Sequence, residues 1–122
     1  MRLVLDSPSH LNLVRQYGNG AIVVGEQRLT QPCIITPSRL IVDWSAQSLE
    51  TLGPAELEPL FATNAQVVLL GFGERQAFAN PAVRAAFQTR RIALECMTLG
   101  AACRTYNILA GEDRPVAAGL FP

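Results

Sequence analysis

A run of four branched apolar residues at positions 67–70, followed by Gly71-Phe72-Gly73, constrains the fold of this chain most. No polar residue alternates within the run, so both faces of the segment are expected to be buried. Its short length, between Gln66 and Gly71, is typical of a strand rather than a helix. A strand that is covered on both faces requires one layer above it and another below it. The sequence therefore predicts an α/β fold in which this strand is central and ends in a tight turn, with positive φ at Gly71 and Gly73.

Five short runs with strand character occupy the first third of the chain, at residues 11–14, 21–24, 28–30, 33–36 and 40–42. Turn-forming residues separate them, and the Gly and Asn residues at positions 18–20 tolerate the positive φ of hairpin turns. Pro32 and Pro37 remove hydrogen-bond donors from a ladder, so they are expected at strand starts or edges. We expect meander strands, some of which form a small sheet beside the central one.

From residue 44 onward the pattern changes to helices that alternate with strands. The predicted elements are a helical turn at 47–52, a helix at 55–63 after Pro54, a linker at 74–79, a helix capped by Asn80 with Pro81 first, a strand at 91–95, a helix from Thr98 to Gly111 and a strand at 114–120. The strand, helix and strand between residues 67 and 95 fit in about 30 residues and predict two parallel strands. One domain over residues 1–122 is expected at this length.

The balance of charges bears on the partners of the protein. Ten basic and ten acidic residues give a formal net charge of zero, so nucleic acid and an anionic membrane are not expected as partners. All ten basic residues are arginines, which excludes mechanisms that need a lysine, such as Schiff-base chemistry. No run approaches the ~20 apolar residues of a membrane-spanning helix, and the acidic Asp6 near the start is unlike a targeting peptide.

The three cysteines indicate a reducing compartment and no metal centre. Cys33, Cys96 and Cys103 match no zinc-binding spacing, and the single histidine, His10, is distant in sequence. An odd number of cysteines without a signal peptide fits free thiols. We expect a cytoplasmic protein of bacterial type, without a metal or any other cofactor.

Gly71-Phe72-Gly73 after a strand has a dinucleotide-binding alternative, in which Glu95 at the end of the next strand would bind a ribose. Gln76 occupies the place of the third glycine of that fingerprint. The following helix also starts near Asn80, which is too late for its N-terminus to reach a pyrophosphate held by the glycines. We therefore interpret the segment as a tight turn.

A cysteine nucleophile is the other catalytic alternative. Cys96 lies two residues before the predicted cap Thr98, where a helix dipole can lower the pKa of a thiol. A nucleophilic cysteine usually needs a base, and the sequence does not place His10 beside it. Cys103 falls on the apolar stripe of the helix and is expected in the core. No residue is therefore assigned a catalytic role.

Polar residues flank the apolar stripe of the last helix, namely Arg104, Thr105 and Asn107, with Glu112 and Arg114 after its end. They can line a polar pocket or tie the helix to the sheet through hydrogen bonds, and structural bonding is the favoured interpretation. A pocket at the carboxyl ends of the parallel strands, between residues 71–73 and the start of the last helix, is the alternative.

Several strings of residues together resemble a known family. They are Met97-Thr98, residues 101–107 (Ala-Ala-Cys-Arg-Thr-Tyr-Asn), Leu109, Glu112, residues 114–118, residues 70–73, Tyr17-Gly18, residues 22–25, Pro37 and Trp44. The sequence resembles a family of small single-domain proteins long described as of unknown function, which includes the mitochondrial complex I assembly factor 3 and an adipogenesis-associated protein. The resemblance implies a three-layer α/β domain with a mixed central sheet, helices packed on it and an additional N-terminal β-hairpin element. It implies no established catalytic residues, and the assembly role of one member implies contact with proteins.

Two functions are carried forward from these observations. The first is a non-enzymatic soluble domain that binds another protein as an accessory or assembly factor. The second is a small-molecule-binding or enzymatic domain that uses the pocket between the glycine turn and the start of the last helix. The candidate pocket or interaction residues are Gly71, Gly73, Thr98, Arg104, Thr105 and Asn107.

Overall fold

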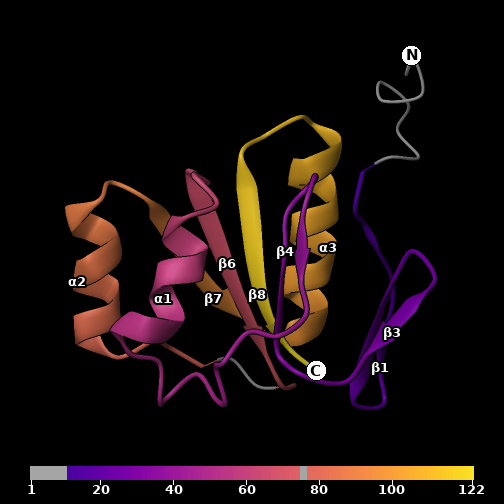
Figure 1. Ribbon diagram of the computed structural model, residues 1–122, viewed down its shortest axis with the longest axis horizontal. Helices are drawn as coiled ribbons and strands as arrows, with labels where there is room; N and C mark the ends of the chain where they lie inside the picture. Colours follow the sequence, from indigo (N-terminus) through magenta and orange to yellow (C-terminus); the bar gives the residue numbers. More distant parts are fainter. Residues whose placement is uncertain (1–10, 75–76) are drawn as a thin grey trace.

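The computed structural model describes residues 11–74 and 77–122 (Figure 1). The expectations for Asp6, His10 and Gln76, and part of the expected linker at 74–79, lie outside these residues. Eleven elements follow one another along the described chain: β1 (Val14–Gly18), β2 (Ala21–Val24), β3 (Gln27–Leu29), β4 (Cys33–Ile35), β5 (Leu40–Ile41), α1 (Pro54–Phe61), β6 (Val67–Phe72), α2 (Pro81–Thr89), β7 (Ala93–Met97), α3 (Leu99–Gly111) and β8 (Val116–Phe121).

The strands form two sheets. β1, β2 and β3 make an antiparallel three-stranded meander, and the other five strands lie in the order β5-β4-β8-β6-β7. Within the larger sheet β6 is parallel to both β7 and β8, whereas β4 is antiparallel to both β8 and β5. The predicted mixed central sheet and the additional N-terminal β element are both confirmed, and β6 is an internal strand as its apolar sequence requires.

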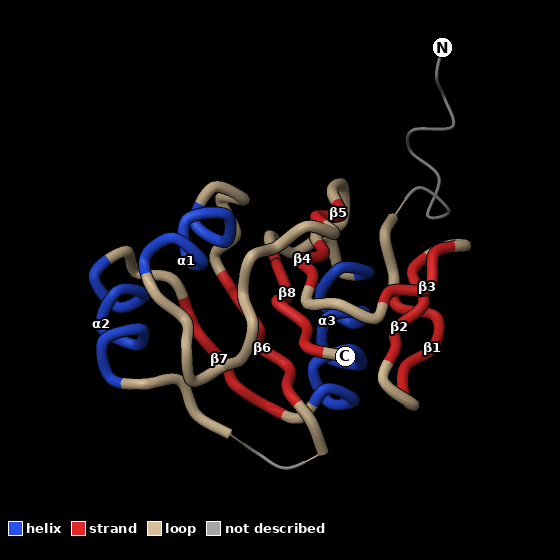
Figure 2. The backbone as a smooth tube through the Cα atoms, turned by 60° about the horizontal axis from the view of Figure 1, so that its bottom comes forward, coloured by secondary structure: helices blue, strands red, loops and turns tan. Residues whose placement is uncertain are grey.

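The larger sheet separates two hydrophobic cores, which gives the predicted three layers. Figures 1 and 2 show α1 and α2 on one side of this sheet, and α3 with the small sheet on the other. Val68 and Leu70 of β6 point into the first core, whereas Leu69 points into the second. Phe87 of α2 is fully buried in the first core, where such a side chain stabilises the fold by roughly 1.5–3 kcal/mol.

Each of the two later helices begins at the cap that the sequence predicts. The Asn80 side chain accepts a hydrogen bond from the backbone N–H of Val83 at 2.9 Å, and Pro81 occupies the first turn of α2. The Thr98 hydroxyl oxygen accepts from the N–H of Ala101 at 3.2 Å, which starts α3 directly after β7. These caps fix where the helices begin relative to the ends of the strands.

Several predicted boundaries shift by a few residues. β1 starts at Val14 instead of ending there, because the Asn107 side chain pairs with both backbone groups of Val14 and Tyr17 is still paired with β2. β7 starts at Ala93 instead of residue 91, because Arg91 has a left-handed φ of 59°. The expected helical turn at 47–52 is one hydrogen-bonded turn, in which the Thr51 N–H donates to the Ser48 carbonyl at 3.3 Å.

The two glycines that end the β6 segment have different roles. Gly73 has a φ of +65°, as the predicted tight turn requires. The same prediction for Gly71 is wrong, because Gly71 lies inside β6 and is not among the residues with positive φ. A Cβ atom at Gly71 would lie 2.5 Å from the Cβ of Ala102. Gly71 therefore serves the close approach of α3 to the sheet rather than a turn.

Candidate functional site

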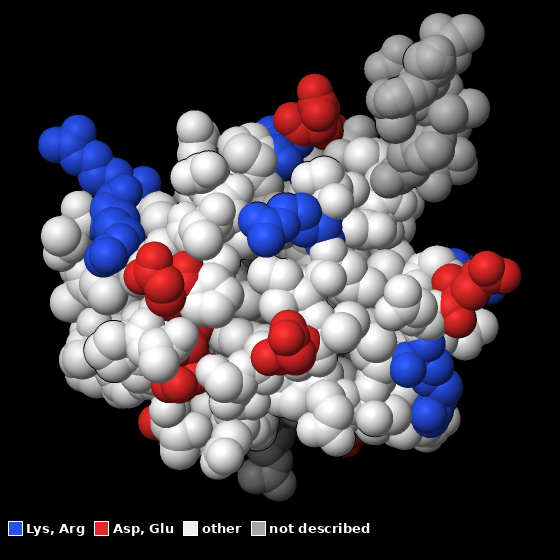
Figure 3. Space-filling view, in the orientation of Figure 1, with Lys and Arg blue, Asp and Glu red and all other residues white. Residues whose placement is uncertain are grey.

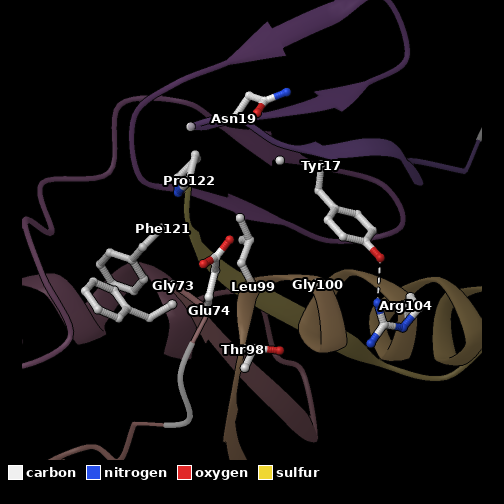
Figure 4. A pocket seen from close by; sticks show the side chains of 13 residues that line it. Tyr17, Asn19, Gly73, Glu74, Thr98, Leu99, Gly100, Arg104, Phe121 and Pro122 are labelled. Carbon is white, nitrogen blue, oxygen red and sulfur yellow. Dashed lines mark hydrogen bonds between the residues drawn. The ribbon is translucent and has the colours of Figure 1, made fainter.

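A pocket of about 670 Å³ opens where β6 and β8 end and α3 begins (Figure 4). It is lined by residues 17–20 at the tip of the β1–β2 hairpin, residues 72–74 after β6, residues 98–100 and Arg104 of α3, and residues 121–122 at the end of β8. We call it the end pocket. Because parallel strands end at the same edge of a sheet, this is the edge at which α/β proteins commonly place binding sites.

The start of α3 forms the floor of the end pocket. The N–H of Leu99 donates to the carbonyl of Gly73 at 2.9 Å, which ties the loop after β6 to the helix. A Cβ at Gly100 would lie 2.8 Å from Cε1 of Tyr17. The tip of the hairpin can therefore lie against the helix only because residue 100 lacks a side chain.

Arg104 and Tyr17 form one wall of the end pocket. Nη1 of Arg104 donates a hydrogen bond to the Tyr17 hydroxyl at 2.5 Å, and its guanidinium carbon lies 5.9 Å from the centre of the Tyr17 ring (Figure 4). Both side chains are exposed to solvent. Glu112, a carboxylate after the end of α3, lies with its Oε1 3.9 Å from Nη1 of Arg114, and Arg104 holds the hairpin rather than the end of its own helix.

The structure brings three of the six candidate residues together. Gly73, Thr98 and Arg104 line the end pocket. Gly71 is buried under α3, and Asn107 binds the backbone of β1, with Val14 N–H donating to Oδ1 at 2.9 Å and Nδ2 donating to the Val14 carbonyl at 2.8 Å. Thr105 is half-buried on α3 and is not among the lining residues.

Sequence reasoning missed the contributions of Tyr17, Glu74 and Phe121 to this pocket. Tyr17 stands beside the Gly-Asn-Gly turn, and an aromatic residue next to an exposed hairpin tip is a signal that could have been used. Phe121 carries no such signal, because it also reads as the last buried residue of an apolar strand. Its ring in fact packs against Phe72 with centroids 5.7 Å apart.

The three thiols are free and are held in their protonated form. Burial raises the pKa of Cys33 to about 12 and that of Cys103 to about 11. Burial also raises the pKa of Cys96, and it outweighs the opposing effects of the Ala79 N–H and of Arg84. The lowering by the helix dipole that would make Cys96 a nucleophile is therefore not found.

Replacement of Cys103, which is 1% exposed on the apolar stripe of α3, tests its place in the core. We expect Cys103→Ser to lower the free energy of unfolding by ~1–3 kcal/mol, because the hydroxyl is poorly satisfied there, and Cys103→Ala to lower it less. Urea denaturation measures both changes.

In the folded wild type at pH 8, iodoacetamide should modify the half-buried Cys96 before Cys103. Alkylation of Cys103 at the rate of a free cysteine would contradict the assignment.

Basic and acidic side chains are interspersed on the face of the molecule that Figure 3 draws. They alternate there without a large area of one sign. Within residues 11–74 and 77–122, no group of three or more His, Cys, Asp and Glu side chains is placed to hold a metal ion. None of the helices in these same ranges has the length and apolar character needed to cross a membrane.

The fold and the pocket together define a small three-layer α/β domain with an open pocket at the carboxyl ends of its parallel strands. The sequence profile of one family, described as "Protein of unknown function (DUF498/DUF598)", matches residues 14–121. The chain belongs to this family, which confirms the resemblance seen in the sequence.

Named relatives include the NADH dehydrogenase [ubiquinone] 1 alpha subcomplex assembly factor 3 of Bos taurus, which is 30% identical over 115 residues. That match covers 89% of this chain and 60% of the bovine protein, so the chain spans less than two thirds of the length of that relative. Among solved structures, a Xanthomonas campestris protein is 42% identical with a TM-score of 0.85, over 99% of this chain and 92% of the other. A Bartonella henselae protein described as an outer membrane protein is 27% identical with a TM-score of 0.80, over 91% of this chain and 94% of the other.

Proposed function

We propose that this chain is a non-enzymatic accessory domain that binds another protein through the end pocket. The observation that carries the proposal is the open pocket whose lining includes Tyr17, Phe72 and Phe121. Aromatic and arginine side chains are enriched where proteins bind one another, and Tyr17 remains 43% exposed beside Arg104. The name of the bovine relative, an assembly factor, supports the same class of function.

The proposed partner is a protein subunit of an NADH dehydrogenase, by analogy with the name of the bovine relative. Neither nucleic acid nor a membrane is part of the proposal. The proposed location is the cytoplasm of a bacterial cell, where a reducing environment keeps the three free cysteines as thiols. The 42% identity with a Xanthomonas campestris protein supports the bacterial assignment.

Two arginine–aromatic pairs on opposite sides of the sheet offer a matched test. Arg104 contacts Tyr17 at the end pocket, whereas Arg90, which directly follows α2, lies 3.9 Å above the centre of the Phe61 ring on the other side. We expect Arg104→Ala, combined with Tyr17→Ala, to reduce the recovery of co-purifying partner proteins from the native host at least tenfold. Arg90→Ala should leave the recovery unchanged. Quantitative mass spectrometry of material purified under reducing conditions measures both.

Equal recovery of the same proteins with wild type and with the Tyr17/Arg104 variant would show that the end pocket is not the binding surface. The identity of the partner is tested separately, by native gel analysis of assembled NADH dehydrogenase in cells that lack the chain. A normal level of the assembled enzyme there would remove NADH dehydrogenase as the partner while leaving protein binding intact.

A small-molecule-binding or enzymatic domain is the second candidate, because a volume of about 670 Å³ lies in the usual range of ligand pockets. A thermal-shift screen of phosphates, nucleotides and carboxylates on wild type and Arg104→Lys separates the two. We expect no compound to raise the melting temperature of the wild type. A reproducible increase that vanishes in Arg104→Lys would favour the small-molecule function, since lysine lacks the planar fork of arginine.

A further inference from the structure

We infer that the end pocket binds an extended peptide segment that carries a hydrophobic side chain followed by a carboxylate side chain. The hydrophobic group lies against Phe72 and Phe121, and the carboxylate lies on Arg104 and Tyr17. This inference rests on the proposed function, because it names the chemistry of the segment that the partner protein presents.

The wall formed by α3 and the hairpin is rich in hydrogen-bond donors. A guanidinium has five N–H groups, and Tyr17 takes one of those of Arg104, so further donors remain for a ligand. The Tyr17 hydroxyl accepts that bond and keeps its own O–H to donate. The Thr98 hydroxyl likewise accepts from the N–H of Ala101 and keeps its O–H. Such a wall is complementary to a carboxylate, which only accepts hydrogen bonds.

The other end of the pocket is apolar. Phe121 ends β8 and is almost fully buried, Phe72 ends β6 and is half-buried, and their rings meet edge to face. Leu99 and Pro122 extend this apolar lining (Figure 4). Because Phe121 and Leu99 are already buried, a hydrophobic side chain of a partner would mainly cover the exposed parts of Phe72 and Pro122, at about 25 cal/mol per Å² buried.

Two features favour a peptide carboxylate over a phosphate. The backbone N–H groups of Leu99, Ala101 and Ala102 already donate to Gly73 and Thr98, so most of the helix N-terminus is not available to an anion. Glu74 also lines the pocket, and its negative charge opposes a doubly charged phosphate more than a carboxylate.

Glu74 has a favourable role towards a peptide. Its carboxylate can accept backbone N–H groups, which a peptide supplies and a simple anion does not. The missing side chain at Gly100 lets Tyr17 and Arg104 lie close to the start of α3, where a Cβ would be 2.8 Å from Cε1 of Tyr17 and 3.2 Å from Nη1 of Arg104. The pocket thus pairs a donor wall, an acceptor and an apolar end, and an extended segment with a hydrophobic and an acidic residue matches all three.

Three capped peptides test the inference by NMR titration of the ¹⁵N-labelled protein: acetyl-Phe-Gly-Asp-amide, acetyl-Phe-Gly-Asn-amide and acetyl-Phe-Gly-Lys-amide. We expect the aspartate peptide to shift the amide signals of the glycines at 18, 20, 73 and 100. It should bind on the order of tenfold more tightly than the asparagine peptide, because the charged acceptor roughly doubles the strength of the hydrogen bonds. The lysine peptide should bind most weakly.

Variants of Arg104 and Arg90 test whether Arg104 causes the preference for the aspartate peptide. Arg104→Gln should abolish the difference between the aspartate and asparagine peptides, whereas Arg90→Gln should retain it. Both side chains are exposed, and the amide spectrum of each variant reports whether it is folded. Equal binding of the three peptides to the wild type, or an aspartate preference that survives in Arg104→Gln, would overturn the inference. So would an inorganic phosphate titration that shifts the same amides as strongly as the aspartate peptide.

The failures of the two proposals are distinguishable. If the Tyr17/Arg104 variant loses its partner proteins while the peptides bind without preference, the end pocket binds protein and the acidic segment is wrong. If the aspartate peptide binds as expected while partner recovery is unchanged in that variant, the proposed function is wrong and the pocket is a carboxylate site of another kind.

Discussion

Replacing Gly71 with alanine is expected to lower the free energy of unfolding by about 3 kcal/mol, at the upper end of what overpacking a core usually costs. The new Cβ would lie 2.5 Å from the Cβ of Ala102 and 3.3 Å from the Cα of Leu99. Both atoms belong to α3, so the clash cannot be relieved by turning a flexible side chain. The helix must move away from β6, and the floor of the end pocket moves with it. Urea denaturation measures the loss.

Gly73→Ala is the matched control, because no atom lies within 4 Å of its ideal Cβ. Its left-handed φ of +65° should still cost about 1 kcal/mol. In the Gly71→Ala background, Ala102→Gly removes the nearest clashing atom and should restore part of the lost stability. A loss at Gly71 no greater than at Gly73, or no coupling between positions 71 and 102, would show that α3 does not pack on β6 as closely as described.

The strands and helices were largely predictable because their sequences carry local signals. The apolar run of β6 shows no alternation, so burial on both faces follows from its composition. Asn80 and Thr98 predict where α2 and α3 begin, because a capping side chain bonds to the backbone within three residues of its own position. The boundaries of β1 and β7 depend instead on Asn107, which is remote in sequence, and on a left-handed Arg91.

The end pocket was predicted only in part, because its walls come from segments that are distant in sequence. Thr98 and Gly73 flank the edge where parallel strands end, and a general rule about α/β sheets places a pocket there. Tyr17 joins the pocket across 87 positions in sequence, through the tip of the hairpin and the hydrogen bond from Arg104. The prediction of a turn at Gly71 was wrong for a different reason. In the sequence, a glycine needed for close helix packing cannot be told from one needed for a turn.

The free energy of unfolding is expected to fall steeply at alkaline pH. Cys33 and Cys103 lie in the same buried cluster, with pKa values raised by burial from 9.0 to about 12 and to about 11. Above pH 9 the unfolded chain releases these two protons while the folded chain keeps them. The folded state therefore binds more protons, and the free energy of unfolding falls as pH rises from 9 towards 11 and 12. Below pH 9 the contribution is fully present.

The free energy of unfolding should be on the order of 3 kcal/mol lower at pH 10 than at pH 8, since each thiol contributes up to about 1.4 kcal/mol per pH unit. Tyr106, whose pKa burial also raises, adds to the loss above pH 10. Cys96, whose pKa burial raises as well, adds to the loss too, but no basic side chain of this chain does. All ten of its basic side chains are arginines, which keep their charge throughout this range, so no lysine loses a proton there.

Urea denaturation under reducing conditions at pH 8, 9, 10 and 10.5 measures the slope. Cys33→Ala and Cys103→Ala each remove one titrating thiol, so each should reduce the slope between pH 9 and 10 by up to about 1.4 kcal/mol per pH unit, while Cys96 and Tyr106 keep part of the slope in both variants. Val116→Ala is the control, because Val116 is 2% exposed in the same cluster and does not titrate. It should lower stability by a similar amount at every pH. Cysteine variants that keep the wild-type slope would mean that the two thiols ionise as readily in the folded protein as in the unfolded chain, and their assignment as buried core residues would then be wrong.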